Sequence, residues 1–155
     1  MERFQPALLL RARTDRGLTQ AELARLAEVE SSVVAMLETG AHRPSAPVVA
    51  ALSTALQVPM DALAPMPRRP TLADYRQQTG RSAKRLAEEL GIPGPSLSRV
   101  ETGLLDLRKV EEHAGLLGIN VDELRRAWER GRRQRLRQAE ARLAEALARE
   151  RERGG

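Results

Sequence analysis

Apolar residues recur at helical spacing in two separate stretches of the chain, and both stretches carry the same pattern. In the first, apolar positions 23, 26 and 29, followed by 34 and 37, predict two short helices with a tight break between them. The second stretch repeats this frame at positions 86, 92, 97 and 100. Further on, residues 58–63 match 119–124, so the second copy is slightly shorter in the loop between these matches. A period of roughly 60 residues is too long for a solenoid unit, so the pattern predicts two copies of one small helical domain.

Polar residues at the ends of the predicted helices support this reading. Thr19 stands where a helix N-cap belongs, and Glu22 follows three residues later, which is the capping-box signature. Arg85 takes the place of that glutamate in the second copy, so the box is lost there. Ser31 is expected to cap the next helix, and Gly40 to end it.

The first copy resembles the Cro/repressor-type helix-turn-helix family (the XRE family), which includes the lambdoid phage repressors. Many independent positions between Leu8 and Leu63 carry the resemblance: Gln20-Ala-Glu-Leu-Ala24, Val29, Val34, Glu38-x-Gly40 and Arg43-Pro44. The second copy matches in its apolar frame and poorly at its polar positions. The resemblance implies an all-α fold with two tandem lambda-repressor-like helix-turn-helix bundles, followed by a basic C-terminal helix.

Four segments follow from the repeat and from composition. Residues 1–64 form the predicted DNA-binding domain, and residues 65–70 are a linker with three prolines, which favour an extended chain. Residues 71–128 form the predicted degenerate second helix-turn-helix domain. Residues 129–155 are an Arg-rich helical tail.

The family places the second helix of the motif in the major groove of DNA, and here that helix corresponds to residues 31–39. The resemblance therefore implies that seven residues of the first domain contact DNA. The predicted base contacts are Ser31, Ser32, Val33 and Met36, and the predicted phosphate contacts are Gln20, Arg43 and Ser45. Glu30 departs from the pattern, because a carboxylate at the mouth of this helix repels phosphate unless it accepts from a cytosine amine.

Two ion pairs are also implied by the resemblance. In the first domain Arg13 would pair with Glu38, and in the second Arg76 would pair with Glu101. Each pair would tie the first helix of its domain to the end of the recognition helix. Such pairs are structural, because a buried charge needs a partner.

The second copy has lost most of the polar residues that would read bases. Ala83 replaces the glutamine, and Pro93, Gly94 and Pro95 occupy the start of the helix. Candidate second DNA contacts are limited to Ser96, Ser98 and Arg99. We interpret this copy as a surface for assembly or for contact with an effector; a second DNA reader is the alternative.

Charge is distributed unevenly along the chain. Residues 1–64 carry a net charge of −1, residues 65–124 a net charge of 0, and residues 125–155 a net charge of +6. The chain has no cysteine, and its two histidines, His42 and His113, lie far apart, so we expect no metal site and no cofactor. No nucleophile–base pair or phosphate loop suggests an enzyme. The apolar runs are too short for a signal peptide or a membrane span, and we expect a cytoplasmic protein associated with the nucleoid.

An apolar stripe runs along the tail. Leu136, Ala139, Leu143 and Ala146 follow heptad spacing, with Leu147 beside them. The stripe is expected to dock on another surface, in the same chain or on a dimer mate, and we predict a homodimer whose interface lies in the second domain and the tail. The surrounding arginines are either a solvated face, the default for a charge run, or a contact with the DNA backbone. Trp128 is expected to pack on the second domain. Two function classes remain: a sequence-specific transcriptional regulator that binds double-stranded DNA, most simply a dimeric repressor, or a protein-interaction module of the antitoxin or anti-repressor type. Near-neutral domains favour the second class, and the intact Gln20, Ser31-Ser32 and Arg43-Pro44 favour the first.

Overall fold

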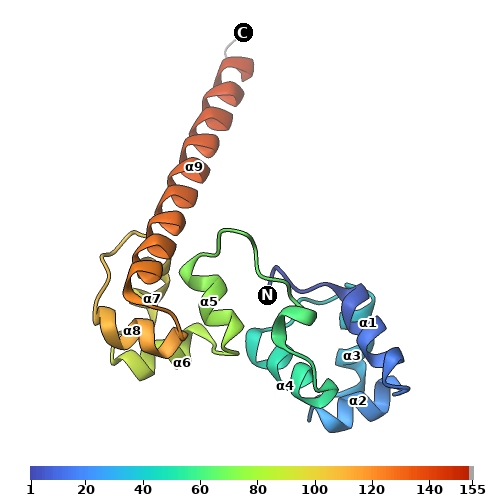
Figure 1. The fold of residues 1–155 in the computed structure, drawn as a ribbon. Helices are drawn as coiled ribbons and strands as arrows, with labels where there is room; N and C mark the ends of the chain where they lie inside the picture. The colour runs from blue at the N-terminus through green and yellow to red at the C-terminus, as the bar shows by residue number, and fades with distance from the viewer. Residues whose placement is uncertain (154–155) are drawn as a thin grey trace. The chain divides into compact units, whose positions relative to one another are not determined.

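The fold is all-α, as predicted, throughout the part of the chain that the computed structural model describes, residues 1–153. The first copy of the repeat forms five elements: α1 (Pro6–Asp15), α2 (Gln20–Leu26), α3 (Ser31–Glu38), α4 (Ala46–Leu56) and the short 3₁₀ helix η1 (Met60–Ala62) (Figure 1). Their apolar faces meet in one core, because the helical spacing in the sequence puts those residues on one side of each helix. Fully buried side chains include Leu9, Leu23, Val34, Leu37, Val49, Leu52 and Leu56.

The second copy repeats this plan in register. Its elements are α5 (Leu72–Gln78), α6 (Ala83–Leu90), α7 (Gly94–Glu101), α8 (Val110–Leu117) and α9 (Val121–Arg153). α6 and α7 begin at the positions that the sequence repeat matches to the starts of α2 and α3, and α9 begins at the position matched to the start of η1. The fifth element is therefore a single turn in the first copy and a helix of 33 residues in the second.

Left-handed backbone occurs at four equivalent places in the two copies, and at two of these the first copy has a residue other than glycine. Glu28, between α2 and α3, has φ of 54°, and Gly91 occupies the same place with φ of 62°. Gln57, after α4, has φ of 51°, and its counterpart Gly118 has φ of 69°. A side chain makes this conformation unfavourable by roughly 1–2 kcal/mol, and glycine adopts it freely. The first copy thus holds strained turns that the second relieves with glycine.

The compact units of the structure do not follow the repeat boundary. One unit comprises Met1–Arg68 with Asp74–Leu86, and the other comprises Arg69–Ala73 with the chain from Ala87 onward. Arg3 explains why α5 belongs to the first unit. Its Nε lies 3.0 Å from an Asp74 carboxylate oxygen, and its Nη2 donates to the Asp74 carbonyl at 3.2 Å. The same guanidinium donates to the Ala64 carbonyl at 2.6 Å, so one side chain joins the end of the first copy to α5.

α9 is unbroken from Val121 to Arg153, and its first three turns belong to the core of the second unit (Figure 1). Leu124 and Ala127 are fully buried. Trp128 packs on this unit, as predicted: its Nε1 donates to the Leu105 carbonyl at 3.1 Å, and Arg132 lies 5.7 Å from the centre of its ring. Position 131 of this helix requires glycine, because the backbone of Glu101 passes so close that a Cβ atom would clash with the Glu101 carbonyl oxygen.

Replacing Gly131 with Ala is therefore expected to destabilise the second unit by about 1–3 kcal/mol, because the added methyl group meets rigid backbone. An exposed helical glycine changed to Ala normally gains up to about 1 kcal/mol. Gly115, in α8, has open space around its Cα and gives the matched control, since Gly115→Ala should be neutral or stabilising. Denaturant unfolding followed by Trp128 fluorescence measures both; a Gly131→Ala protein as stable as Gly115→Ala would contradict the close approach.

Candidate nucleic-acid interface

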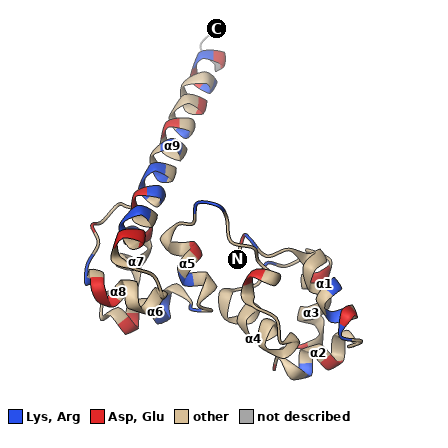
Figure 2. Cartoon of the chain, viewed as in Figure 1, with Lys and Arg blue, Asp and Glu red and all other residues tan. Residues whose placement is uncertain are grey.

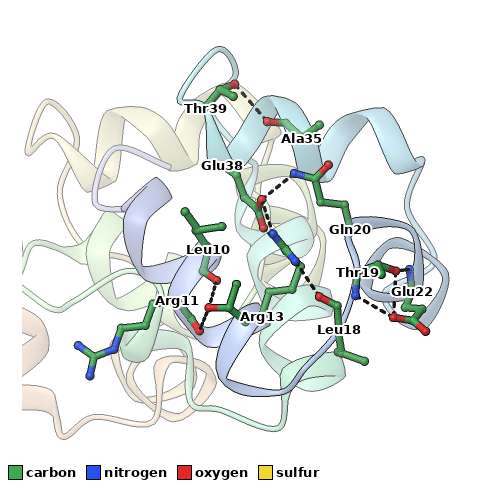
Figure 3. A network of polar contacts seen from close by, with 11 residues as sticks. Leu10, Arg11, Arg13, Leu18, Thr19, Gln20, Glu22, Ala35, Glu38 and Thr39 are labelled. Atoms are coloured by element: carbon green, nitrogen blue, oxygen red, sulfur yellow. Dashed lines mark hydrogen bonds and ion pairs between the residues drawn. The ribbon is translucent and has the colours of Figure 1, made fainter.

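α2, the turn at Glu28 and α3 form a helix-turn-helix whose first helix is firmly capped. Thr19 Oγ1 accepts a hydrogen bond from the Glu22 backbone N–H at 3.1 Å, and a Glu22 carboxylate oxygen accepts one from the Thr19 N–H at 2.7 Å (Figure 3). This confirms the predicted capping box. The hydrogen bonds from Thr19 lower the pKa of Glu22. In the second copy Ser82 Oγ accepts from the Arg85 N–H at 3.1 Å, and the reciprocal arm is missing, as predicted.

The prediction that Ser31 caps α3 was wrong. Glu30 is the N-cap, with extended backbone, and it makes no side-chain hydrogen bond to the helix. Ser31 is instead the first helical residue, so its hydroxyl is not used for capping. A carboxylate beside the positive end of the helix dipole is electrostatically favourable. Glu30 therefore has a structural role at the start of α3, which the family resemblance did not suggest.

The residues predicted to contact bases do not all face outward equally. Ser31 and Ser32 are exposed at the first turn of α3, and Met36 is 40% exposed one turn later. Val33 is half-buried and packs partly against the core, so it presents only part of its side chain. α3 therefore offers two hydroxyl groups and one flexible apolar side chain to a partner.

Residues flanking α3 supply the predicted phosphate contacts. Arg43 is exposed in the loop after α3, and in residues 1–153 it makes neither a hydrogen bond nor an ion pair. Ser45 is the N-cap of α4, yet its hydroxyl does not bond to that helix. Both groups are thus available to an external acceptor.

A buried ion pair holds α1 to the end of α3. Arg13 Nε donates to Glu38 Oε1 at 2.5 Å, and Arg13 Nη2 donates to Glu38 Oε2 at 3.0 Å. The Glu38 side chain is only 4% exposed. Arg13 Nη1 also donates to the Leu18 carbonyl at 2.7 Å, which ties the loop before α2 to the pair. Burial opposes ionisation of Glu38, yet the hydrogen bonds from Arg13 and Gln20 outweigh it, so its pKa lies below the usual value.

Gln20 belongs to the same network, a link that no sequence signal indicated. Its Nε2 donates to Glu38 Oε2 at 2.7 Å (Figure 3). An amide nitrogen carries two hydrogens, so the second N–H of Gln20 remains available. Gln20 is also the first residue of α2, where the backbone N–H has no partner within the helix. The ion pair thus holds Gln20 in one orientation at a helix N-terminus, a place suited to a phosphate oxygen.

The equivalent surface of the second copy is much poorer in polar groups. α7 begins after Pro93 and carries Pro95 in its first turn; Ser98 and Arg99 are exposed, and Ser96 is half-buried. Arg76 and Glu101 are both buried, and Arg76 Nη1 donates to the Arg81 carbonyl at 3.0 Å, which repeats the Arg13–Leu18 bond. The pairing of Arg76 with Glu101 stays a prediction.

Basic side chains are sparse around the first helix-turn-helix. α3 carries no Lys or Arg, and α4 carries no charge at all (Figure 2). α9 carries 11 arginines, seven of them between Arg125 and Arg137. Long-range attraction to phosphate therefore depends on few groups in the first unit.

A family model described as a helix-turn-helix domain matches residues 7–66 and again residues 71–128, which is most of the chain. No curated protein and no solved structure matches the sequence. Within residues 1–153, no helix is both long enough and apolar enough to cross a membrane, and no three His, Asp or Glu side chains are grouped to hold a metal ion.

Proposed function

Because the chain belongs to the helix-turn-helix domain family and carries two such domains in tandem, we propose that it is a sequence-specific transcriptional regulator. In this proposal α3 of the first domain enters the major groove of DNA, and the protein acts as a dimeric repressor in the bacterial cytoplasm, at the nucleoid. The observation that supports the proposal is the Arg13–Glu38–Gln20 network, since it holds in one orientation the Gln20 amide that is predicted to contact phosphate.

The first domain keeps more of the predicted base-reading groups than the second, in which Ser98 and Arg99 are the exposed polar residues of α7. Serine hydroxyls can donate to or accept from several base edges, and the Met36 side chain suits a thymine methyl group. In α7 Gly94 and Pro95 correspond to Ser31 and Ser32 and offer no side-chain hydrogen bond, whereas the exposed Arg99 corresponds to Met36. We assign the second domain to assembly of the protein. Because α7 has few exposed polar side chains, the alternative that this domain binds a protein partner is also supported.

Selection from random duplex DNA, followed by binding measurements, tests the proposal. Ser32→Ala or Met36→Ala should change the preferred sequence, whereas Arg43→Ala should weaken binding to every sequence about equally and lower its salt dependence by about one phosphate contact. Arg11, exposed on α1, provides the control through Arg11→Ala. Enrichment of no sequence over a scrambled duplex would rule out specific DNA recognition and favour the protein-interaction alternative.

The outer part of α9 supports the proposed dimer. From Leu136 to Glu152 every residue is exposed within the chain, and the stripe leucines Leu136, Leu143 and Leu147 are 44%, 62% and 47% exposed. In heptad notation the stripe occupies a and d, which places Arg135, Arg142 and Arg149 at g and Glu140 at e. A second copy of the same helix is the simplest cover for such a stripe.

The flanking charges favour parallel pairing. In a parallel two-stranded coiled coil, a g residue faces an e residue of the partner, so Arg135 would meet the partner's Glu140. Antiparallel pairing would set arginines at g against arginines. Two heptads give only a weak interface, which suits a protein whose two reading domains gain affinity by binding adjacent half-sites together.

A further inference from the structure

A basic groove lies along α9 within the second compact unit. It encloses about 430 Å³ between the extended segment 69–71 and one face of the helix. Its lining residues are Arg69, Thr71, Arg130, Arg133, Gln134, Arg137, Gln138 and Ala141, all of which belong to the second unit. The volume is within the range of small-molecule sites.

Helical spacing gathers the charges on one side. Arg130, Arg133 and Arg137 are three and seven residues apart, so they share a face and span about 10 Å along the axis. Gln134 and Gln138 also line the groove and add amide donors. Arg137 is rotated from Leu136 and Leu143 by roughly 100–120°, whereas Arg133 is only about 60° from Leu136, so this face borders the leucine stripe at one edge.

The groove has a fixed wall and a surplus of positive charge. The Arg130 side chain is 22% exposed, and its Nη2 donates to the Glu123 carboxylate. Its Nε donates to the Pro70 carbonyl at 2.6 Å, and this bond holds segment 69–71 against the helix. Arg133 meets Glu129 only at 3.4 Å, on the exposed surface. Arg69 and Arg137 form no hydrogen bond or ion pair with residues 1–153.

We propose that this groove binds phosphate groups. Guanidinium forks bind phosphate oxygens in bidentate geometry, and several arginines in a row match an anion that carries successive phosphates. The phosphates have two sources, the backbone of bound DNA or a free phosphorylated small molecule. The inference does not need the proposed reading of DNA by α3, since a free ligand would bind without it.

Calorimetric titration of the full-length protein with inorganic tripolyphosphate tests the groove directly. Arg133→Gln combined with Arg137→Gln removes two exposed guanidinium groups and should weaken binding at least tenfold. Arg142→Gln combined with Arg149→Gln removes the same charge from exposed positions about 120–140° around the helix from Arg137 and should leave binding nearly unchanged. Thermal unfolding checks that both variants fold.

The salt dependence of DNA binding identifies the source. If the groove holds DNA phosphates, the slope of log K against log salt should fall by about two in the Arg133→Gln, Arg137→Gln protein and not in the control. Tripolyphosphate binding with an unchanged slope identifies a free ligand. The proposal is wrong if wild type and both double variants bind tripolyphosphate with equal affinity and show equal salt slopes for DNA binding. It is also wrong if both double variants lose tripolyphosphate affinity to the same extent. If neither wild type nor the variants bind DNA, the tripolyphosphate affinities alone decide whether the groove binds phosphate.

Discussion

A Glu38→Ala protein is expected to lose about 3–5 kcal/mol of unfolding free energy, because the substitution leaves the Arg13 guanidinium in a nearly buried site without its carboxylate. The loss corresponds to a fall in melting temperature of roughly 12 °C or more for a domain of this size. Thermal and denaturant unfolding measure it. Gln20 also loses the acceptor that orients it, so affinity for DNA should fall even at temperatures where the protein is folded.

The exposed pair Arg11–Asp15 gives the matched control in the same domain. Its atoms are 3.7 Å apart and its side chains are 78% and 69% exposed, so Asp15→Ala should change stability by less than about 1 kcal/mol. Replacing both Arg13 and Glu38 by apolar residues should recover part of the loss, since no unpaired charge then remains. A Glu38→Ala protein as stable as Asp15→Ala would show that the pair contributes nothing.

The stabilising effect of Glu38 should depend on pH in a defined direction. The hydrogen bonds from Arg13 and Gln20 hold its pKa below the unfolded value of about 4.3, so this contribution is complete above that pH. It is lost as pH falls through the folded pKa, because the unfolded chain then binds the proton more readily. The difference in stability between wild type and Glu38→Ala should therefore shrink when pH is lowered from 7 to 3. A constant difference across this range would mean that Glu38 does not titrate as proposed.

Leu136→Glu combined with Leu143→Glu is expected to abolish the dimer and to lower operator affinity about 100-fold or more, because two linked reading domains bind far more tightly than two separate ones. Both leucines are exposed within one chain, so the monomer should keep its fold. Light scattering measures the oligomeric state, and titration of an operator with two half-sites measures the affinity.

Ala144→Glu combined with Ala148→Glu adds the same charge at exposed positions of α9 that belong neither to the stripe nor to the lining of the basic groove, and it should leave the dimer intact. These substitutions are preferable to cutting the chain after Trp128. Such a cut removes Gly131, which packs on Glu101, and Arg135, whose Nε donates to the Thr102 carbonyl at 3.2 Å. A dimer that survives the leucine substitutions would place the interface elsewhere.

The apolar period and the repeat predict the helices and the tandem domains, because helical spacing and burial are coupled along the sequence. Local polar chemistry was harder to predict. Ser31 and Glu30 are both plausible at a helix start, and only the backbone angles decide which one is the cap. Arg3 links the first copy to α5 through Asp74, seventy-one residues away, and nothing in the sequence around Arg3 signals so distant a partner.

The basic groove could not be predicted from the sequence for a different reason. The arginines of the tail are visible in composition, yet a run of charges is usually a solvated face. Segment 69–71 packs against α9, where Arg130 donates a hydrogen bond to the Pro70 carbonyl. Because of this contact, some of the arginines line a groove and the others face solvent. That contact joins residues sixty positions apart and has no local pattern.

The unbroken course of α9 joins its two surfaces mechanically. The arginine face and the leucine stripe lie on one rod without a hinge, and the rod is seated in the second unit by Gly131. If the proposed dimer forms and the groove binds phosphate, any free energy by which phosphate favours pairing of two such helices must return, by thermodynamic reciprocity, as tighter phosphate binding in the paired state. Self-association and anion binding would then be one linked equilibrium, and either could be measured through the other.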